Sequence, residues 1–177
     1  SGIQGVHAPV LHSLGSSNAA SIEALRLTLQ EGILPNLPGR LLTLPRAIPV
    51  KAPVVGGNLC MLSAICGTTW QLDATGTILL LEEISEPAYK VDRMINQLRM
   101  SGVLDGVVGV AFGSFIGTDP PEGVDWTTEE LLFDLVSDLG VPVITGLPVG
   151  HGADNFPFVF GKQASIQPSG LVFSSAP

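Results

Sequence analysis

The sequence predicts an α/β fold, and three features of its 177 residues carry that prediction. Continuous apolar runs alternate along the chain with amphipathic segments of helical period, which is the pattern of strands and helices in turn. Apolar residues make up 45% of the chain, enough for a substantial core, whereas charged residues make up only 14%. The 21 glycines and 14 prolines indicate many turns between short elements.

The first third of the chain is expected to hold one helix between short extended segments. Residues 3–11 are strand-like, and residues 33–55 are apolar but interrupted by proline, which favours short strands and loops over a helix. Between them, Ser21 is the expected cap of an amphipathic helix. Gly32 follows at a suitable C-terminal stop.

A second helix is expected to open at Gly56, Gly57 and Asn58 and to run to about Cys66, with Asn58 as its cap. The two cysteines, Cys60 and Cys66, are six residues apart, which is about 240° around a helix. A disulfide between them would be strained, and the spacing does not suit zinc. The sequence therefore predicts two free thiols and a reducing compartment.

The rest of the chain alternates strands and helices and ends in a hairpin. The expected elements are a buried strand at 78–81, a helix from Pro87 through Leu98, a strand at 106–112, a loop at 117–121, a helix from the capping box of Thr127 and Glu130 to Gly140, a strand at 141–145, a glycine-rich loop at 146–155, and hairpin strands at 164–166 and 171–173.

The charge balance argues against several classes of partner. Eight Lys and Arg stand against 16 Asp and Glu, for a net charge of −8. The basic residues are scattered, so we expect neither nucleic acid nor an anionic membrane surface as a partner. No apolar run approaches the roughly 18 to 20 residues of a membrane span, and the opening does not read as a signal peptide.

Two acidic residues, Glu82 and Glu83, end a strand that otherwise contains only Ile and Leu. Successive strand residues point to opposite faces of a sheet, so at most one of the pair can enter a given site. Glu82 continues the buried run directly and is the better candidate for a catalytic carboxylate, with Glu83 as the fallback. The alternative is structural: a strand-end carboxylate that pairs with arginine or caps backbone N–H groups.

His151 lies between Gly150 and Gly152, directly after a predicted strand. The glycines leave the backbone free to place the ring in a cleft, and imidazole changes charge near neutral pH, as a general base requires. A loop histidine without a role is the alternative. His7 and His12 lack metal-ligand spacing with each other or with His151, so no metal site is expected and neither residue is assigned a role.

A carboxylate that orients a histidine makes two thirds of a nucleophilic triad, and the third member is missing. The chain contains no Gly-x-Ser-x-Gly motif. Gly56, Gly57 and Asn58 are candidate substrate-binding residues, because a helix start attracts a carboxylate or an oxyanion. Turn geometry explains the two glycines about as well. The residues alone therefore support an incomplete hydrolase site.

Four stretches in order resemble the LD-carboxypeptidases, serine peptidases that trim muramoyl tetrapeptides, and the related microcin-immunity peptidases. The stretches are GGNLCMLSAICGT (56–68), ILLLEEISEPAYKVDRMINQLRMSG (78–102), VVGVAFGSF (107–115) and GLPVGHG (146–152). Together they cover most of residues 50–162. Four motifs in sequence are far more specific than any one of them.

The resemblance implies an enzyme of two domains: an N-terminal flavodoxin-like domain with the nucleophilic serine, and a C-terminal domain of swivelling β/β/α type with a glutamate and a histidine. The glutamate falls at Glu82 and the histidine at His151, whereas the serine motif would lie upstream of residue 1. We therefore expect residues 1–15 to be the tail of the N-terminal domain, 16–50 the linker and the start of the C-terminal domain, and 51–177 the C-terminal domain.

The reaction implied by the resemblance is acyl transfer in cytoplasmic peptidoglycan recycling. The serine attacks the carbonyl between meso-diaminopimelate (or Lys) and the terminal D-Ala, His151 moves the proton, and Glu82 holds the imidazole ring. No metal or organic cofactor is implied. The expected partners are the muropeptide substrate and the N-terminal domain, and a homodimer is left open. The chain alone is expected to be inactive.

Two other functions remain open at this point. A microcin-immunity peptidase would cleave an acyl-adenylate-like substrate, which favours an aromatic residue in the cleft for stacking on the base. Trp70 and Trp126 are the only tryptophans, and packing is the more common role of such residues. A non-catalytic muropeptide-binding module would keep the fold and bind peptide without turnover.

Overall fold

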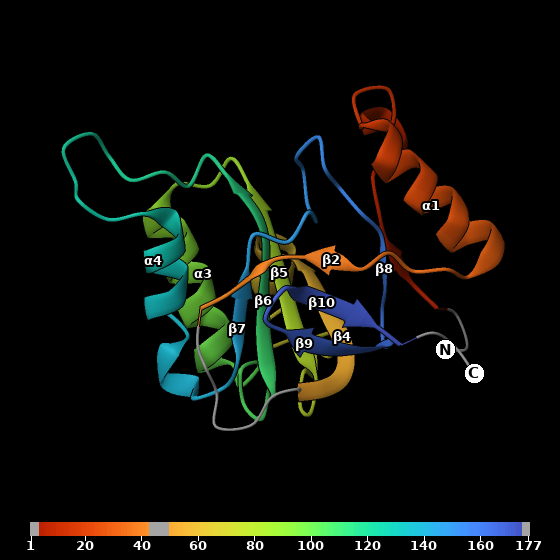
Figure 1. The fold of residues 1–177 in the computed structure, drawn as a ribbon. Coiled ribbons are helices and arrows are strands. Elements are labelled where there is room, and N and C mark those ends of the chain that lie inside the picture. Colours follow the sequence, from red (N-terminus) through yellow and green to blue (C-terminus); the bar gives the residue numbers. More distant parts are fainter. Residues whose placement is uncertain (1–3, 43–49, 175–177) are drawn as a thin grey trace.

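The computed structural model describes residues 4–42 and 50–174 (Figure 1). Its helices are α1 (Ala19–Glu31), α2 (Leu59–Ala64), α3 (Ala88–Met100) and α4 (Thr128–Asp134), with 3₁₀ turns η1 (Leu11–Ser13) and η2 (Ser137–Leu139). Its strands are β1 (Val6–His7), β2 (Leu37–Pro38), β3 (Arg40–Leu41), β4 (Val50–Asn58), β5 (Ile78–Ile84), β6 (Gly109–Ile116), β7 (Val143–Thr145), β8 (Phe158–Val159), β9 (Gln163–Gln167) and β10 (Gly170–Phe173). The predicted α/β class is confirmed.

Eight of these strands form one nearly closed sheet, in the order β2-β10-β9-β4-β5-β6-β7-β3. Strands β4 to β7 are parallel, and the pairings outside them are antiparallel. The two end strands, β2 and β3, are separated in sequence by Gly39 alone. The segment 37–41 therefore pairs with β10 on one side and with β7 on the other, and this brings the two ends of the sheet together.

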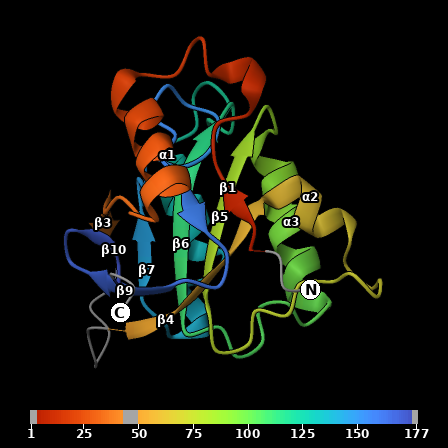
Figure 2. The ribbon, with the colours of Figure 1, turned by 90° about the vertical axis from the view of Figure 1, so that its right-hand side faces the viewer.

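Helices lie on both sides of the sheet, and α2, α3 and α4 are the ones that pack against it. Figure 2 shows α2 and α3 on one side of the central strands and α1 on the other, and Figure 1 shows α4 beside α3. Two apolar clusters follow from this arrangement. One lies between the sheet and α2, α3 and α4, and the other lies on the opposite, inner face of the sheet.

Strand β5 contributes to both clusters in strict alternation. Leu79 and Leu81 belong to the cluster under the helices, whereas Ile78 and Leu80 belong to the inner cluster, and all four are fully buried. This is the two-residue period of a strand that is buried on both faces. The polar residues that follow on β5, Glu82 and Glu83, therefore point to these two faces in turn.

The helix after the first loop begins three residues earlier than predicted. Its cap is Asn18, whose side-chain oxygen accepts a hydrogen bond from the backbone N–H of Ser21. The assignment of the cap to Ser21 is therefore wrong, and Ser21 lies fully buried in the first turn of α1. Gly32 ends the helix in the left-handed conformation, as predicted.

The predicted helix opening at Gly56 is also wrong, because Gly56 and Gly57 lie in β4, just before its last residue Asn58, and pair with Leu80 and Leu81 of β5. Gly56 has φ +135°, and a Cβ placed there would lie 1.9 Å from the carbonyl oxygen of Leu80. Only glycine fits this approach between parallel strands. Asn58 does cap α2, as predicted, by accepting from the N–H of Met61.

Most other differences are shifts of boundaries. Helix α2 ends at Ala64 instead of Cys66, the strand expected at 106–112 is β6 (Gly109–Ile116), and the strand expected at 141–145 is the shorter β7. The helix expected from Thr127 to Gly140 divides into α4 and η2, although its capping box of Thr127 and Glu130 is present. The helix after Pro87 and the C-terminal hairpin, β9 and β10, are confirmed.

The N-terminal strand-like stretch is reduced to β1, which pairs antiparallel with β8, a strand that the sequence did not reveal. Ile3 and residues 43–49 of the stretches expected at 3–11 and 33–55 lie outside the described residues. The pairing brings residues 6 and 7 against a segment more than 150 residues later in the chain. The domain boundaries at residues 15 and 50 stay predictions.

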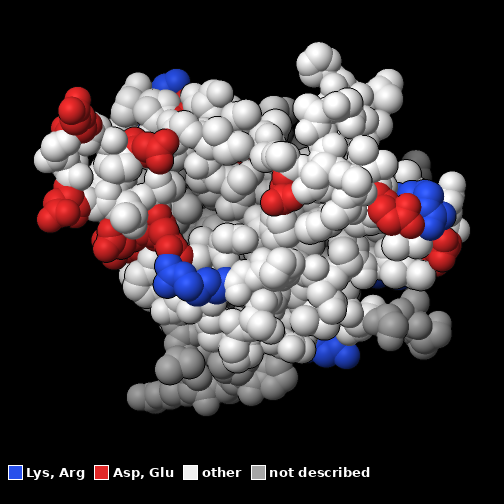
Figure 3. All heavy atoms as spheres, turned by 45° about the horizontal axis from the view of Figure 1, so that its top comes forward, with Lys and Arg blue, Asp and Glu red and all other residues white. Residues whose placement is uncertain are grey.

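Basic side chains form no continuous patch on the face shown in Figure 3, where several of them lie beside acidic ones. Arg26 pairs with Glu23 and Glu31 at 2.8 and 3.2 Å, and Arg40 pairs with Glu129. Within the described ranges, no helix is both long enough and apolar enough to cross a membrane.

Candidate functional site

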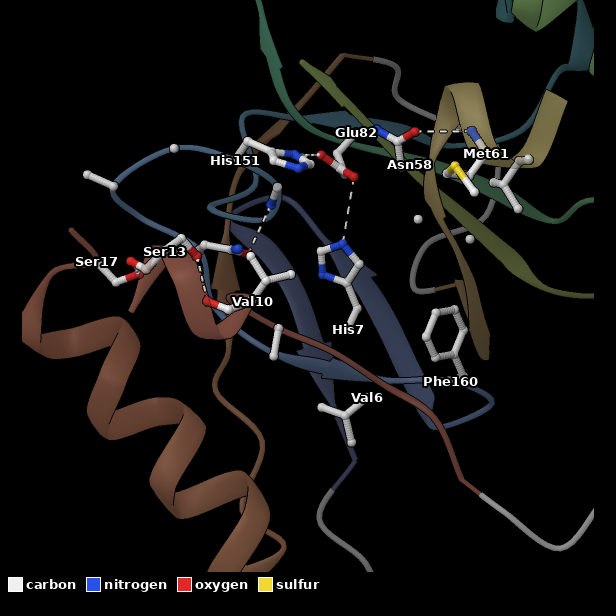
Figure 4. Close-up of a pocket in the computed structure, with 18 of the residues that line it drawn as sticks. Val6, His7, Val10, Ser13, Ser17, Asn58, Met61, Glu82, His151 and Phe160 are labelled. Atoms are coloured by element: carbon white, nitrogen blue, oxygen red, sulfur yellow. Dashed lines mark hydrogen bonds and ion pairs between the residues drawn. The ribbon is translucent and has the colours of Figure 1, made fainter. Parts of the chain in front are cut away.

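A pocket of about 600 Å³ opens at the carboxyl ends of the parallel strands β4 and β5 (Figure 4). The sequence-predicted site residues come together here, because Glu82, His151, Gly56, Gly57 and Asn58 all line it. Its other lining residues come from the N-terminal segment, from α2, from the loop between β7 and β8, and from Phe160 directly after β8. Ligand sites in α/β proteins commonly lie at this end of a parallel sheet.

The carboxylate of Glu82 binds the imidazole of His151 directly. Oε2 of Glu82 lies 2.8 Å from Nδ1 of His151, a short distance typical of a charge-assisted hydrogen bond. Glu82 is fully buried, whereas 42% of the His151 side chain is exposed. A buried carboxylate on Nδ1 leaves Nε2 as the nitrogen available to a reacting group, which is the arrangement of an acid–base histidine.

The pKa of Glu82 is lowered from its ordinary value. Burial is the largest single effect and acts to raise this pKa, but the interactions with His7 and His151 together outweigh it. Glu82 is therefore ionised at neutral pH although it is fully buried. A fixed negative charge in this position would stabilise an imidazolium on His151.

The loop that carries His151 is held by buried polar groups. The N–H of Gly150 donates to Oδ1 of Asn155 at 3.1 Å, and the N–H of Asn155 donates to Oγ of Ser21 at 3.0 Å. The N–H of His151 donates to Oγ of Ser114 at 3.2 Å. Gly150 itself has φ +126°, and a Cβ there would lie 2.8 Å from Oε2 of Glu82, so glycine is required beside the carboxylate.

Glu83 faces the opposite side of β5 and caps α2. Its Oε2 accepts from the N–H of Cys60 at 2.7 Å, and its Oε1 accepts from Nδ2 of Asn58 at 3.1 Å and from the N–H of Ile84 at 2.8 Å. Glu83 is 2% exposed and is not among the residues that line the pocket. Glu83 thus has the geometry of the structural alternative, a strand-end carboxylate that caps backbone N–H groups.

Asn58 lies next to both Glu82 and Glu83. It pairs with Glu82 in the register of β4 and β5, its side chain caps α2 and bonds Glu83, and it also lines the pocket. Gly56 and Gly57 line the pocket from the end of β4. They do so as strand residues, and the helix start that suggested anion binding at the glycines begins after them.

His7 is the site residue that the sequence analysis missed. Its Nε2 lies 3.7 Å from Oε1 of Glu82, and the ring lines the pocket. No periodic pattern pointed to this residue, because β1 is two residues long and its partner β8 is distant in the chain. His12, by contrast, lies in η1 and is exposed.

A nucleophile is not in place among residues 4–42 and 50–174, where no Ser hydroxyl or Cys thiol hydrogen-bonds the His151 ring. Ser13, Ser16 and Ser17 line the pocket, but the bonds that their hydroxyls donate go to backbone carbonyls of their own segment. The same ranges hold no group of three His, Cys, Asp or Glu side chains suited to a metal ion.

Comparison with protein families matches residues 51–166 to the family described as "LD-carboxypeptidase C-terminal domain". A putative carboxypeptidase from Synechocystis is 39% identical over 167 residues, which cover 94% of this chain and 54% of that protein. The murein tetrapeptide carboxypeptidase of Pseudomonas aeruginosa is 32% identical, over 94% of this chain and 57% of that protein. The chain thus spans about half the length of these curated relatives.

Two solved structures superpose on nearly the whole of this chain. The muramoyltetrapeptide carboxypeptidase from Oxalobacter formigenes superposes with a TM-score of 0.78 at 28% identity, covering 99% of this chain and 63% of that one. The microcin C7 self-immunity protein superposes with a TM-score of 0.80 at 19% identity, covering 99% of this chain and 62% of that one, and shares the fold.

Proposed function

The chain belongs to the LD-carboxypeptidase C-terminal domain family, and from that premise we propose that it supplies the carboxylate and the imidazole of a serine peptidase acting on murein peptides. One observation carries the proposal: a fully buried Glu82 holds Nδ1 of His151 at 2.8 Å inside a pocket. A buried, ionised carboxylate on a partly exposed imidazole has the geometry of two members of a triad.

In the proposed reaction, His151 accepts the proton of a serine hydroxyl through Nε2 as the serine attacks the peptide carbonyl. Glu82 keeps the ring in the tautomer that carries the proton on Nδ1 and stabilises the imidazolium that forms. His151 then delivers the proton to the leaving amine of D-alanine, and water hydrolyses the acyl-enzyme. The serine is proposed to lie in a segment upstream of residue 1, in keeping with relatives about twice as long.

The proposed substrate is an L,D-linked muropeptide that ends in D-alanine, processed in the cytoplasm. The names of two relatives support the murein peptide, since they are murein tetrapeptide and muramoyltetrapeptide carboxypeptidases. The described lining of the pocket contains no tryptophan, tyrosine, lysine or arginine, and Phe160 is its aromatic member apart from the histidines. Trp70 is 81% exposed and lies outside the lining. This gives little support to a nucleotide-bearing, microcin-like substrate.

The test is release of D-alanine from an L,D-linked muropeptide, measured for the 177-residue chain alone and for the chain joined to the upstream segment that the proposal requires. We expect release only from the longer protein. Release by the chain alone would place the nucleophile within it and overturn the split triad. Peptide binding without turnover in both forms would favour the binding module, and cleavage of an aminoacyl sulfamoyl adenosine instead would favour the microcin-immunity type.

A further inference from the structure

The carboxylate of Glu82 has two oxygens, and only one of them is used by His151. Oε2 holds Nδ1 of His151, while Oε1 is buried and has no hydrogen-bond partner among the described residues. Burying a carboxylate oxygen without a hydrogen-bond partner costs free energy, so a nearby polar group that offsets this cost is expected. The imidazole of His7 lies on this side of the carboxylate, with Nε2 3.7 Å from Oε1.

The ring of His7 is held in this position by its neighbours. His7 pairs with Phe158 in the β1–β8 ladder, and the two rings stack with centroids 5.0 Å apart and planes at 17°. Its side chain is 18% exposed, and a Cβ placed on Gly57 would lie 3.8 Å from its Cδ2. Strands β1, β4 and β8 therefore surround the ring.

Packing alone does not explain an imidazole at this position. Nδ1 of His7 is buried and also lacks a hydrogen-bond partner in the described part of the chain, so the ring carries a polar atom that a phenyl ring would not. The nitrogen that faces Glu82 is what distinguishes the imidazole from an apolar ring of similar shape. Figure 4 shows Glu82 between the two rings, with His151 on one side of the carboxylate and His7 on the other.

We propose that His7 is a positioning residue, which anchors Oε1 of Glu82 so that Oε2 stays directed at Nδ1 of His151. With a single partner, the carboxylate is free to rotate about its last bond, and each departure from the productive angle weakens the bond to His151. The imidazole nitrogen of His7, 3.7 Å from Oε1, attracts this oxygen and opposes the rotation. The role rests on the proposed function, in which the orientation of His151 matters for the reaction.

Other groups around Glu82 do not replace His7. Gly113 of β6 and Gly150 of the His151 loop come close to Glu82 and have no side chain, and no described residue donates a hydrogen bond to Oε1. Glu83 points to the other face of β5. The lowered pKa of Glu82 is consistent with two imidazole partners, although burial, the largest effect, acts in the opposite direction.

The activity test uses the chain joined to its upstream segment and compares two substitutions. His7→Phe keeps a ring that can stack on Phe158 and removes the nitrogen, whereas His7→Gln places an amide N–H near the position of Nε2. We expect His7→Phe to lower kcat roughly tenfold to a hundredfold with KM nearly unchanged, and His7→Gln to restore most of kcat. Equal kcat in His7→Phe and wild type, or equal loss in both variants, would overturn the proposal.

A second readout is independent of peptidase activity. In NMR spectra of the 177-residue chain, the Nδ1 proton of His151 reports its bond to Glu82 through slow exchange with water. We expect this proton to exchange faster in His7→Phe, to stay protected in His7→Gln, and to lose protection in Glu82→Ala. Unchanged exchange in His7→Phe would overturn the positioning role. The expected exchange pattern in a protein that releases no D-alanine would instead keep the positioning role and reject the proposed function.

Discussion

Two neighbouring carboxylates on β5 are buried to nearly the same degree, but they differ in the groups that surround their oxygens. Glu82 and Glu83 are 0% and 2% exposed. Glu83 accepts three hydrogen bonds from the start of α2 and from its own strand, and both of its oxygens are satisfied. Glu82 faces two imidazoles, and one of its oxygens has no hydrogen-bond partner among the described residues.

The comparison separates a structural carboxylate from one suited to chemistry. A carboxylate whose two oxygens both accept N–H groups of the chain is fixed in place, and its bonds stabilise the start of a helix. A carboxylate that is satisfied mainly by titratable side chains in a pocket responds when those side chains gain or lose a proton. The two-residue period of β5 places the two kinds on opposite faces of the sheet.

The largest expected effect is on turnover. In the chain joined to the upstream segment that the proposed function requires, Glu82→Ala and His151→Ala should each lower kcat by on the order of a thousandfold or more, because each removes a member of one acid–base unit. The double variant should be little worse than either single variant. D-alanine release gives the measurement, with Glu83→Gln as the matched control on the adjacent residue. Near wild-type turnover in Glu82→Ala, with a large loss in Glu83→Gln, would reverse the assignment.

The second expected effect is on stability and belongs to Glu83. Glu83→Ala leaves the N–H groups of Cys60 and Ile84 and the amide of Asn58 without their acceptor. We expect a loss of about 1–3 kcal/mol in the free energy of unfolding, with a smaller loss in Glu83→Gln, which keeps one acceptor. Denaturant unfolding of the 177-residue chain measures both values. A Glu83→Ala variant as stable as wild type would show that these bonds contribute nothing net.

The sequence was sufficient to predict the class of fold and the placement of Glu82 and Glu83 on opposite faces of one strand. Both predictions depend on patterns that are local in the sequence. The segment of β5 is an unbroken apolar run, and successive strand residues point to opposite faces of a sheet, which separates the two glutamates. The helix after Pro87 followed from its apolar spacing for the same reason.

What the sequence did not reveal depends on contacts between distant segments. His7 reaches Glu82 only because β1 pairs with β8, and two-residue strands carry no periodic signal. Asn18 takes the cap of α1 in place of Ser21, whose hydroxyl accepts from Asn155 more than 130 residues away. Gly56 and Gly57 belong to a strand because β5 approaches them too closely for a side chain at Gly56, a fact of tertiary structure.

The third expected effect is on the pH dependence of stability and belongs to Glu82. Its pKa in the folded state lies below its ordinary value, so the unfolded chain binds the proton more tightly. The contribution of Glu82 to stability is therefore complete above the unfolded pKa and is lost as pH falls through the folded pKa. Between about pH 5 and pH 3, the free energy of unfolding should fall less steeply in Glu82→Gln than in wild type. Parallel acid limbs would contradict the lowered pKa.

The smallest expected effect comes from the hydroxyl that holds the backbone of His151. Ser114→Ala removes the acceptor of the His151 N–H, a neutral bond of 3.2 Å at an exposed residue where water can replace it. Asn155→Ala removes the acceptor of the Gly150 N–H, where both residues are buried and water cannot replace it as readily.

We therefore expect Ser114→Ala to lower kcat only about two- to fivefold, and Asn155→Ala to lower it more, by roughly tenfold. D-alanine release by the two variants, side by side with wild type, gives the comparison. The order of the two effects is the informative result, because it follows from burial and not from distance to the ring. A larger loss in Ser114→Ala would mean that its hydroxyl does more than hold the backbone of His151.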